Sequence, residues 1–167
     1  MDNRPVPCFN IVLVAPEIPQ NTGTIGRLCV CTDAALHLIR PLGYSLDEAH
    51  LRRAGMDYWQ FLNLTVYDNW DDFLERQNHP ERLFFCSTKT TRSIYDCPLR
   101  EGDFLVFGNE GHGLPPDFYI RYQDKLWTIP MPGLHARSHN LANSVAIALY
   151  EGLRQSRWSR PCSAISQ

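Results

Sequence analysis

The stretch Phe-Leu-Val-Phe-Gly-Asn-Glu-Gly-His-Gly-Leu-Pro, residues 104–115, runs from a short apolar block directly into a turn with three glycines. Such an apolar block is typical of a strand that is buried on both faces of a parallel sheet. Glycines that follow a strand let the backbone approach a ligand closely. The stretch therefore predicts a buried strand at 104–107 that ends in a ligand-binding loop; the alternative is a plain turn.

The loop at 108–113 has neither the spacing of a dinucleotide fingerprint nor the Gly-Lys-Ser/Thr ending of a P-loop. Glu110 stands among its glycines with little side-chain cover, so we expect its carboxylate to hold an arginine or a backbone amide. A second polar segment, Arg-Ser-His-Asn-Leu-Ala-Asn-Ser at 137–144, directly precedes a helix-patterned run. Small polar residues at the start of a helix offer N–H groups and hydroxyls to a ligand. The two segments together predict a cofactor pocket.

Strands and helices alternate along the rest of the chain. The strongest helix pattern places Leu141, Val145, Ala148 and Leu149 on one face. Alternation of this kind predicts an α/β fold with a mostly parallel sheet and helices on both faces. We expect strands at 9–14, 36–39, 64–67, 82–86, 104–107 and 126–129, and helices at 22–33, 45–53, 69–76 and 141–154.

Length and composition fit one domain of a soluble globular protein, with 167 residues, 44% hydrophobic and 20% charged. We expect a tail at 1–8, a single domain at 9–156 and a second tail at 157–167. No apolar run is long enough to span a membrane, and the N-terminus lacks the pattern of a secretory signal. The six cysteines form no Cys-x-x-Cys pair, which favours reduced thiols and a cytoplasmic location.

The net charge of −2 argues against a protein held to nucleic acid by bulk charge, although it allows a local basic patch. Arginine suits phosphate because its guanidinium makes bidentate bonds. Candidate phosphate contacts are Arg52, Arg53, Lys89 and Arg92, and the alternative for the adjacent arginine pair is a solvated helix face. His135 and His139 have no glutamate partner, so we expect no metal site.

The loop at 15–23 follows the first expected strand and opens a helix that contains Arg27. Loops at the carboxyl ends of parallel strands are where α/β proteins bind ligands. Asn21 and Arg27 are therefore candidates to point toward one end of the sheet; the alternative is a capped helix with a solvent-exposed arginine. The apolar segment at 129–137 contains two prolines and is a candidate wall for an adenine, or else an ordinary connection.

These segments together resemble the SPOUT, or trefoil-knot, RNA methyltransferases, and among them the TrmL/YibK-like branch that 2′-O-methylates the wobble nucleotide of tRNA. The resemblance covers residues 10–155, and the order and spacing of its motifs are specific as a set. The motifs that carry it are Asn-Ile-Val-Leu at 10–13, Pro-Glu-Ile-Pro-Gln-Asn-Thr-Gly at 16–23, Leu-Arg-Arg-Ala-Gly-Met-Asp-Tyr at 51–58, Phe-Gly-x-Glu-x-x-Gly-Leu-Pro at 107–115, Ile-Pro-Met at 129–131 and Arg-Ser-x-Asn-Leu at 137–141.

The resemblance implies a C-terminal trefoil knot, S-adenosylmethionine as cofactor with S-adenosylhomocysteine as product, no metal, tRNA as partner, and a homodimer whose subunits share the site. It makes Arg27 the catalytic arginine at the ribose 2′-hydroxyl and Asn21 the asparagine that supports it. The positions expected to hold the cofactor are Cys86, Gly108, Glu110, Gly113, Ile129, Ser138, Asn140 and Leu141.

Two departures from the branch concern the RNA target. Gly111 and His112 stand where the branch usually has a threonine and a basic residue, and the loop at 132–136 differs in sequence and length. The alternatives that stay open are a 2′-O-methyltransferase for a tRNA guanosine or for ribosomal RNA, and a non-catalytic RNA-binding knot protein. A dinucleotide-dependent oxidoreductase would need a glycine fingerprint after the first strand, where residues 15–21 stand instead.

Overall fold

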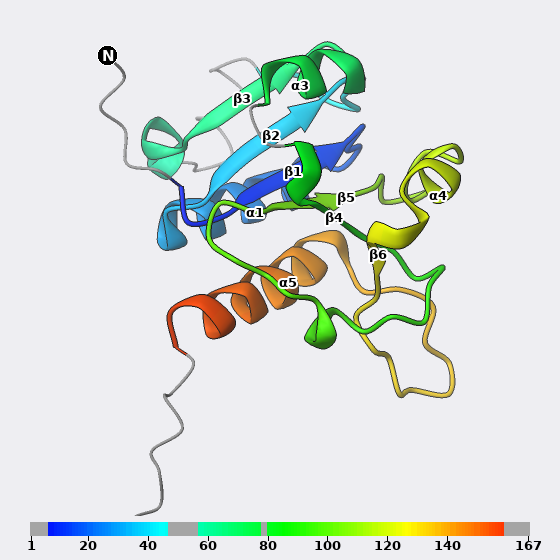
Figure 1. The fold of residues 1–167 in the computed structure, drawn as a ribbon. Coiled ribbons are helices and arrows are strands. Elements are labelled where there is room, and N and C mark those ends of the chain that lie inside the picture. Colours follow the sequence, from blue (N-terminus) through cyan, green and yellow to red (C-terminus); the bar gives the residue numbers. More distant parts are fainter. Residues whose placement is uncertain (1–6, 47–56, 78–79, 159–167) are drawn as a thin grey trace, which may run out of the picture.

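The computed structural model describes residues 7–46, 57–77 and 80–158, which contain one six-stranded sheet (Figure 1). Every neighbouring pair of strands is parallel, and the order across the sheet is β3-β2-β1-β5-β4-β6. The predicted mostly parallel sheet is thus confirmed. The strands are β1 (Asn10–Val14), β2 (Ala35–Ile39), β3 (Leu64–Tyr67), β4 (Leu83–Cys86), β5 (Phe104–Phe107) and β6 (Leu126–Trp127).

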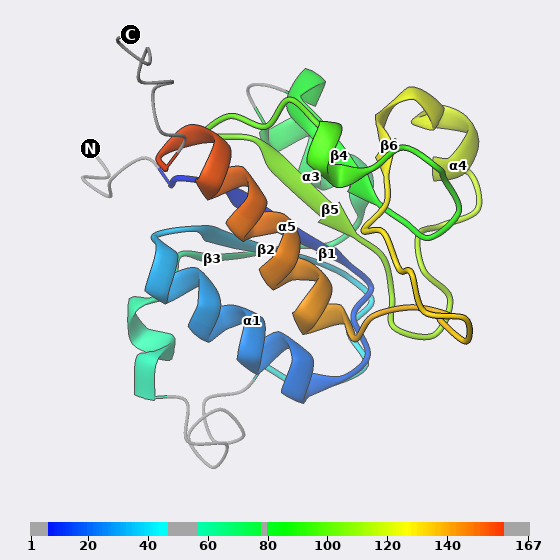
Figure 2. The same ribbon diagram turned by 90° about the horizontal axis from the view of Figure 1, so that it is seen from below.

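Helices cover both faces of the sheet, as predicted. Figure 2 shows α1 (Pro19–Thr32) and α5 (Leu141–Ser156) side by side on one face, while α3 (Trp70–Arg76) lies on the other. Because successive side chains of a strand point to opposite faces, β1 divides its residues between two apolar clusters. Ile11 and Leu13 pack in the cluster that includes residues of α1 and α5. Val12 and Val14 pack in the cluster with Phe73 and with Phe118 of α4 (Phe118–Arg121).

The register of the sheet brings the ends of three strands together. Phe107 at the end of β5 is paired with Leu13 of β1 and with Cys86 at the end of β4. Cys86 is in turn paired with Trp127 at the end of β6. Since all strands are parallel, the loops that follow β1, β4, β5 and β6 leave from the same edge, where ligands of parallel sheets bind.

Some predicted boundaries differ from those of the structure. Helix α1 begins at Pro19, three residues before the predicted start, because proline is favoured in the first turn, where its missing N–H costs nothing. The predicted strand at 126–129 stops at Trp127: Thr128 only bridges to Ser93, and Pro130 cannot donate to a strand ladder. The predicted helix at 45–53 falls mostly outside the described residues.

Several other expectations have a structural counterpart. Cys8, at the end of the expected N-terminal tail, is already buried in the core, and the domain limits stay a prediction. The cysteines at 8, 29, 31, 86 and 97 are free thiols. Within the described ranges, no helix combines the length and apolar character that crossing a membrane requires. The trefoil knot stays a prediction of the family resemblance.

A tight helix contact gives the first prediction. A Cβ atom at Gly152 of α5 would lie 2.6 Å from Cζ of the buried Phe9 ring. Glycine to alanine in a helix normally stabilises, but here we expect Gly152→Ala to lower the free energy of unfolding by about 1–3 kcal/mol because the core is overpacked. Urea denaturation measures this free energy. The control is Gly133→Ala, because a Cβ atom at Gly133 would have only one neighbouring atom, at 3.9 Å. Equal or greater stability of Gly152→Ala would contradict the prediction.

Candidate functional site

A cavity of about 510 Å³ opens at the carboxyl edge of the sheet. Its walls come from the start of α1, the loops that follow β4 and β5, and the segment between β6 and α5. The size is that of a small-molecule site. Ten residues singled out from the sequence line it, namely Asn21, Cys86, Lys89, Gly108, Glu110, Gly113, Ile129, Ser138, Asn140 and Leu141.

The loop after β5 folds back tightly on itself. Asn109 and Gly113 exchange two backbone hydrogen bonds of 2.9 Å, and the Asn109 side chain accepts from the amides of Gly111 and His112. A Cβ atom at Gly108 would lie 2.0 Å from the carbonyl carbon of Gly113, and Gly113 itself has a φ of +74°. The loop therefore requires glycine at both of these positions for its own closure.

Glu110 holds the start of α1. Its carboxylate accepts hydrogen bonds from the amides of Glu17 (2.8 Å) and Ile18 (3.2 Å) and from Nδ2 of Asn21 (3.1 Å). Helix α1 has Ile18 at its N-cap and no acidic residue in its first turn, so this distant carboxylate takes the place of a local cap. Burial alone would raise the Glu110 pKa, but the hydrogen bonds from Glu17 and Asn21 outweigh it and lower the pKa. Of the two partners expected for Glu110, the backbone amide is the one observed.

Asn21 and Asn140 extend this arrangement to α5. Nδ2 of Asn140 donates to Oδ1 of Asn21 (3.0 Å), while Oδ1 of Asn140 accepts from the amides of Ala142 and Asn143 and caps α5. One hydrogen-bonded network therefore joins the β5 loop to the N-termini of both long helices. Each of these helix ends carries a partial positive charge toward the cavity.

Apolar and neutral groups form part of the remaining wall. Ile129 and Leu141 are nearly buried beside the partly buried Met131, as an adenine wall requires. Burial raises the pKa of the Cys86 thiol, which keeps it protonated and unsuited to nucleophilic attack. No three His, Cys, Asp or Glu side chains gather as metal ligands in the described part of the chain. The arrangement can bind and orient a small molecule.

Residues 8–150 match the model of the SpoU rRNA methylase family. The chain belongs to this family. It is 48% identical over 149 residues to the tRNA (cytidine(34)-2′-O)-methyltransferase of Saccharophagus degradans, covering 88% of this chain and 95% of that one. It is 42% identical over 154 residues to a putative tRNA (cytidine(34)-2′-O)-methyltransferase of Bacillus subtilis, and the match covers 90% of this chain and 94% of that one.

Solved structures of SpoU-type proteins have the same fold. A structure that concerns 2′-OH methylation of C/U34 on tRNA superposes with a TM-score of 0.79 at 42% identity, over 88% of this chain and 95% of that one. The SpoU methyltransferase AviRb of Streptomyces viridochromogenes, in complex with AdoMet, superposes with a TM-score of 0.77 at 24% identity. The superposition covers 96% of this chain and 63% of that one. At that identity the second likeness concerns the fold alone.

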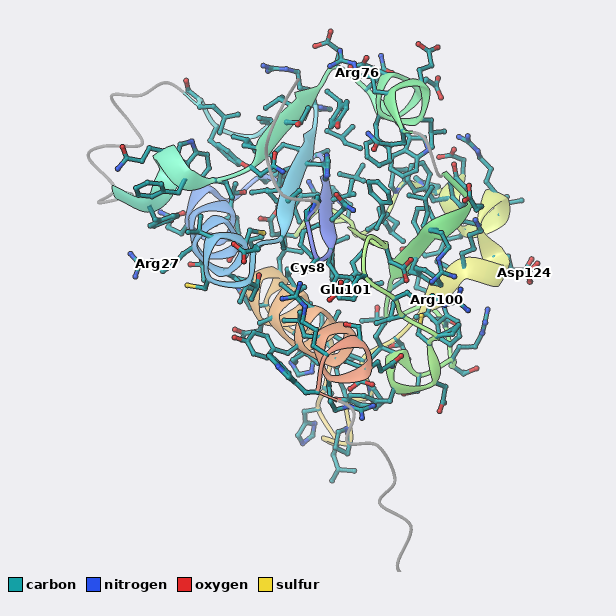
Figure 3. All side chains as sticks on the ribbon, turned by 60° about the vertical axis from the view of Figure 1, so that its left-hand side comes forward. Cys8, Arg27, Arg76, Arg100, Glu101 and Asp124 are labelled. Atoms are coloured by element: carbon teal, nitrogen blue, oxygen red, sulfur yellow. The ribbon has the colours of Figure 1, made fainter. Side chains whose placement is uncertain are left out.

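Arg27, the catalytic residue expected from the SPOUT resemblance, is not among the residues that line the cavity of its own chain. It is exposed on α1, and Figure 3 shows it pointing away from the body of the molecule. Asn21 is buried and lines the cavity. Six residues of α-helix rotate a side chain about 120° away from its starting direction. The expectation that both side chains point to one end of the sheet is therefore wrong within a single chain.

The basic residues proposed for RNA separate into three groups. Lys89 lines the cavity, with Nζ 4.6 Å from the ring centroid of Tyr119. Arg92 lies over Trp127 with Cζ 3.9 Å from the ring centroid, and donates to the carbonyl of Asp124. Arg52 and Arg53 are outside the described residues.

Sequence reasoning missed several residues of the cavity wall. Asn109 closes the glycine loop, and its place directly after Gly108 in a glycine-rich turn was a signal that an asparagine turn forms there. Tyr119 reaches the cavity from the short helix α4, to which the sequence pattern assigned no role. No local signal pointed to Tyr119, because only the packing of α4 beside the loop brings it there.

The Glu110 network gives the second prediction. Glu110→Gln should lower the free energy of unfolding near pH 7 by about 1 kcal/mol, because the helix start loses a charged acceptor. A lowered pKa means that this stability is complete above the ordinary glutamate pKa of about 4.3 and is lost as the pH falls through the folded value. The difference in the free energy of unfolding between Glu110→Gln and the wild type should therefore become smaller below about pH 4.

Denaturation at several pH values measures this gap. The control is Glu75→Gln on α3, an exposed position where we expect a change within about 0.5 kcal/mol. A gap that is absent at pH 7, or that stays constant down to pH 3, would contradict the role given to Glu110.

Proposed function

We propose that this protein transfers a methyl group from S-adenosylmethionine to the ribose 2′-hydroxyl of the wobble nucleotide of tRNA, cytidine or uridine 34. The carrying observation is that the motifs at 16–23, 107–115, 129–131 and 137–141 all contribute residues to one cavity, in a chain that matches cytidine-34 methyltransferases over nearly their whole length. The family model and the fold support methyl transfer to RNA, and the cytidine-34 activity of these relatives supports the nucleotide.

The cavity has the chemistry that the cofactor requires. The apolar wall of Ile129, Met131 and Leu141 suits an adenine. The glycine-rich loop at 108–113 lines the cavity with backbone that carries no side chain at its three glycines. Cys86, Gly108, Glu110, Gly113, Ser138 and Asn140 complete the proposed cofactor site. When bound, the sulfonium of the cofactor supplies an activated methyl group, and S-adenosylhomocysteine is the product. No metal takes part in the proposal.

The protein's own task is alignment and charge stabilisation. Asn21 is held between Glu110 and Asn140, which sets it rigidly at the mouth of the cavity. A guanidinium has five N–H donors and no free acceptor, so Arg27 is no general base in the proposal. In the proposal its positive charge fixes a neighbouring phosphate and stabilises the alkoxide that develops as the 2′-hydroxyl loses its proton to that phosphate or to water.

Arg27 reaches a cavity only through a second copy of the chain. Its guanidinium points outward from α1, and Arg27 is not among the residues that line its own cavity. We therefore include in the proposal the homodimer of the family resemblance, with the cavity of one copy facing Arg27 of the other. The free thiols of the described cysteines fit a cytoplasmic protein that meets tRNA there.

The third prediction tests the activity and its target. The purified protein with labelled S-adenosylmethionine should methylate a tRNA that has cytidine or uridine at position 34, and nuclease mapping with mass spectrometry should place the methyl group on that ribose. The matched control is the same tRNA with a 2′-deoxy nucleotide 34. Methylation of a guanosine or of ribosomal RNA would favour a sister activity, and no transfer to any RNA would favour a binding protein.

The fourth prediction tests the shared site by complementation. Arg27→Ala should lose methylation but bind cofactor normally in calorimetry. Gly108→Val should lose cofactor binding, because its side chain collides with the backbone of Gly113 and Leu114. Refolding the two inactive variants together at a 1:1 ratio should restore about a quarter of wild-type activity, since half of the dimers then carry one intact site. No recovery, with mixed dimers present, would place Arg27 at its own chain's cavity; normal turnover by Arg27→Ala would refute its catalytic role.

The fifth prediction concerns Lys89, whose ammonium is placed to meet either RNA or cofactor. As an RNA contact, Lys89→Ala should weaken tRNA binding and reduce the slope of affinity against salt by about one, without changing cofactor affinity. Arg76→Ala is the control, because Arg76 pairs with Asp72 (2.7 Å) and lies on α3 (Figure 3). A fall in cofactor affinity with an unchanged salt slope would move Lys89 to the cofactor.

A further inference from the structure

Tyr58 links two points of helix α1 that are one turn apart. It lies in the 3₁₀ segment η1 (Asp57–Phe61), which packs against α1. Its hydroxyl donates to the carbonyl of Gly23 (2.5 Å), and its ring lies beneath the guanidinium of Arg27, with Cζ 5.0 Å from the ring centroid. A side chain held at one turn of the helix therefore supports the arginine of the next turn.

The packing around Tyr58 leaves its ring little freedom to move. A Cβ atom at Gly26 would lie 3.0 Å from Cζ3 of Trp59 and 3.2 Å from Cδ2 of Leu62, so η1 and the residue after it approach α1 as closely as glycine permits. Gly23 and Gly26 are buried, and Tyr58 is half-buried. The ring thus has a defined position relative to the helix that carries Arg27.

An aromatic support suits an arginine that has to act on another molecule. The face of the ring attracts the guanidinium through its quadrupole, which uses none of the five N–H donors. A carboxylate partner would neutralise the charge and occupy two of those donors. In the described part of the chain, no acidic side chain forms an ion pair with Arg27. The exposed guanidinium is therefore restrained while its charge and its donors stay available.

We propose that Tyr58 is a positioning residue for Arg27, which presents the guanidinium to the RNA ribose in a restricted set of orientations. This inference rests on the catalytic role given to Arg27 in the proposed function. Misplacement of a catalytic group by about an ångström can cost up to about a hundredfold in rate. The ring carries most of the effect, and the hydroxyl keeps the ring in register with the helix.

Three variants separate these contributions in the full-length protein. Tyr58→Leu removes ring and hydroxyl and should lower kcat at least about tenfold, while the Kd for S-adenosylmethionine and the KM for tRNA stay within about twofold. Tyr58→Phe keeps the ring and should restore kcat to within about threefold of wild type. Trp59→Leu is the matched control, because it disturbs the same contact between η1 and α1 without removing the ring beneath Arg27. Its kcat should exceed that of Tyr58→Leu at an equal loss of thermal stability.

A double mutant links the effect to Arg27. In an Arg27→Lys background, measured under single-turnover conditions, adding Tyr58→Leu should lower the rate by less than about threefold, because the planar guanidinium is already gone. An equal loss in both backgrounds would overturn the inference, as would a Tyr58→Leu protein that keeps wild-type kcat while Arg27→Ala is inactive. Full activity of Arg27→Ala would instead refute the proposed function. If Tyr58→Leu fails to fold, Tyr58→Phe becomes the deciding variant. A loss of kcat above about tenfold in Tyr58→Phe would contradict the inference that the ring carries most of the effect.

Discussion

The carboxylate of Glu110 connects the two halves of this molecule at the edge of the sheet. It leaves the loop after β5 and satisfies two amides at the start of α1, a helix that has no cap of its own. Asn21 and Asn140 continue the same network to the start of α5. Without this carboxylate, three segments that are far apart in sequence would lose the charged acceptor that holds them at one point.

A parallel sheet makes this convergence useful. All strands end at the same edge of the sheet, so the loops that follow β1, β4, β5 and β6 lie around the same cavity. The glycine loop closes on itself without side chains in the way, and the apolar residues after β6 form the facing wall. The result is a preorganised site that binds and aligns, as direct transfer from an activated donor requires.

Under the proposed function, the two sides of α1 have different roles. The first turn carries Asn21 into the cavity, while the next turns present Arg27 to the outside, over the ring of Tyr58. Under the proposed function, a helix whose two sides serve different protomers gives a catalytic site only to the assembled dimer. Formation of the dimer would then be a condition for chemistry, in addition to any stability it provides.

The amino-acid sequence by itself determined the parallel α/β architecture and the segments of the cavity, because apolar strand runs, helix periodicity and glycine loops are local signals. It also suggested a backbone partner for Glu110, although not which amides. Only the tertiary structure decided that Glu110 caps α1, that Gly108 is required by loop closure, that Tyr119 joins the wall and that Arg27 turns outward onto Tyr58. The first three features depend on how residues separated in sequence pack, which no local pattern encodes. The angle between Asn21 and Arg27 follows from their spacing on a helix, but only the packing of α1 decides which of the two side chains faces the cavity.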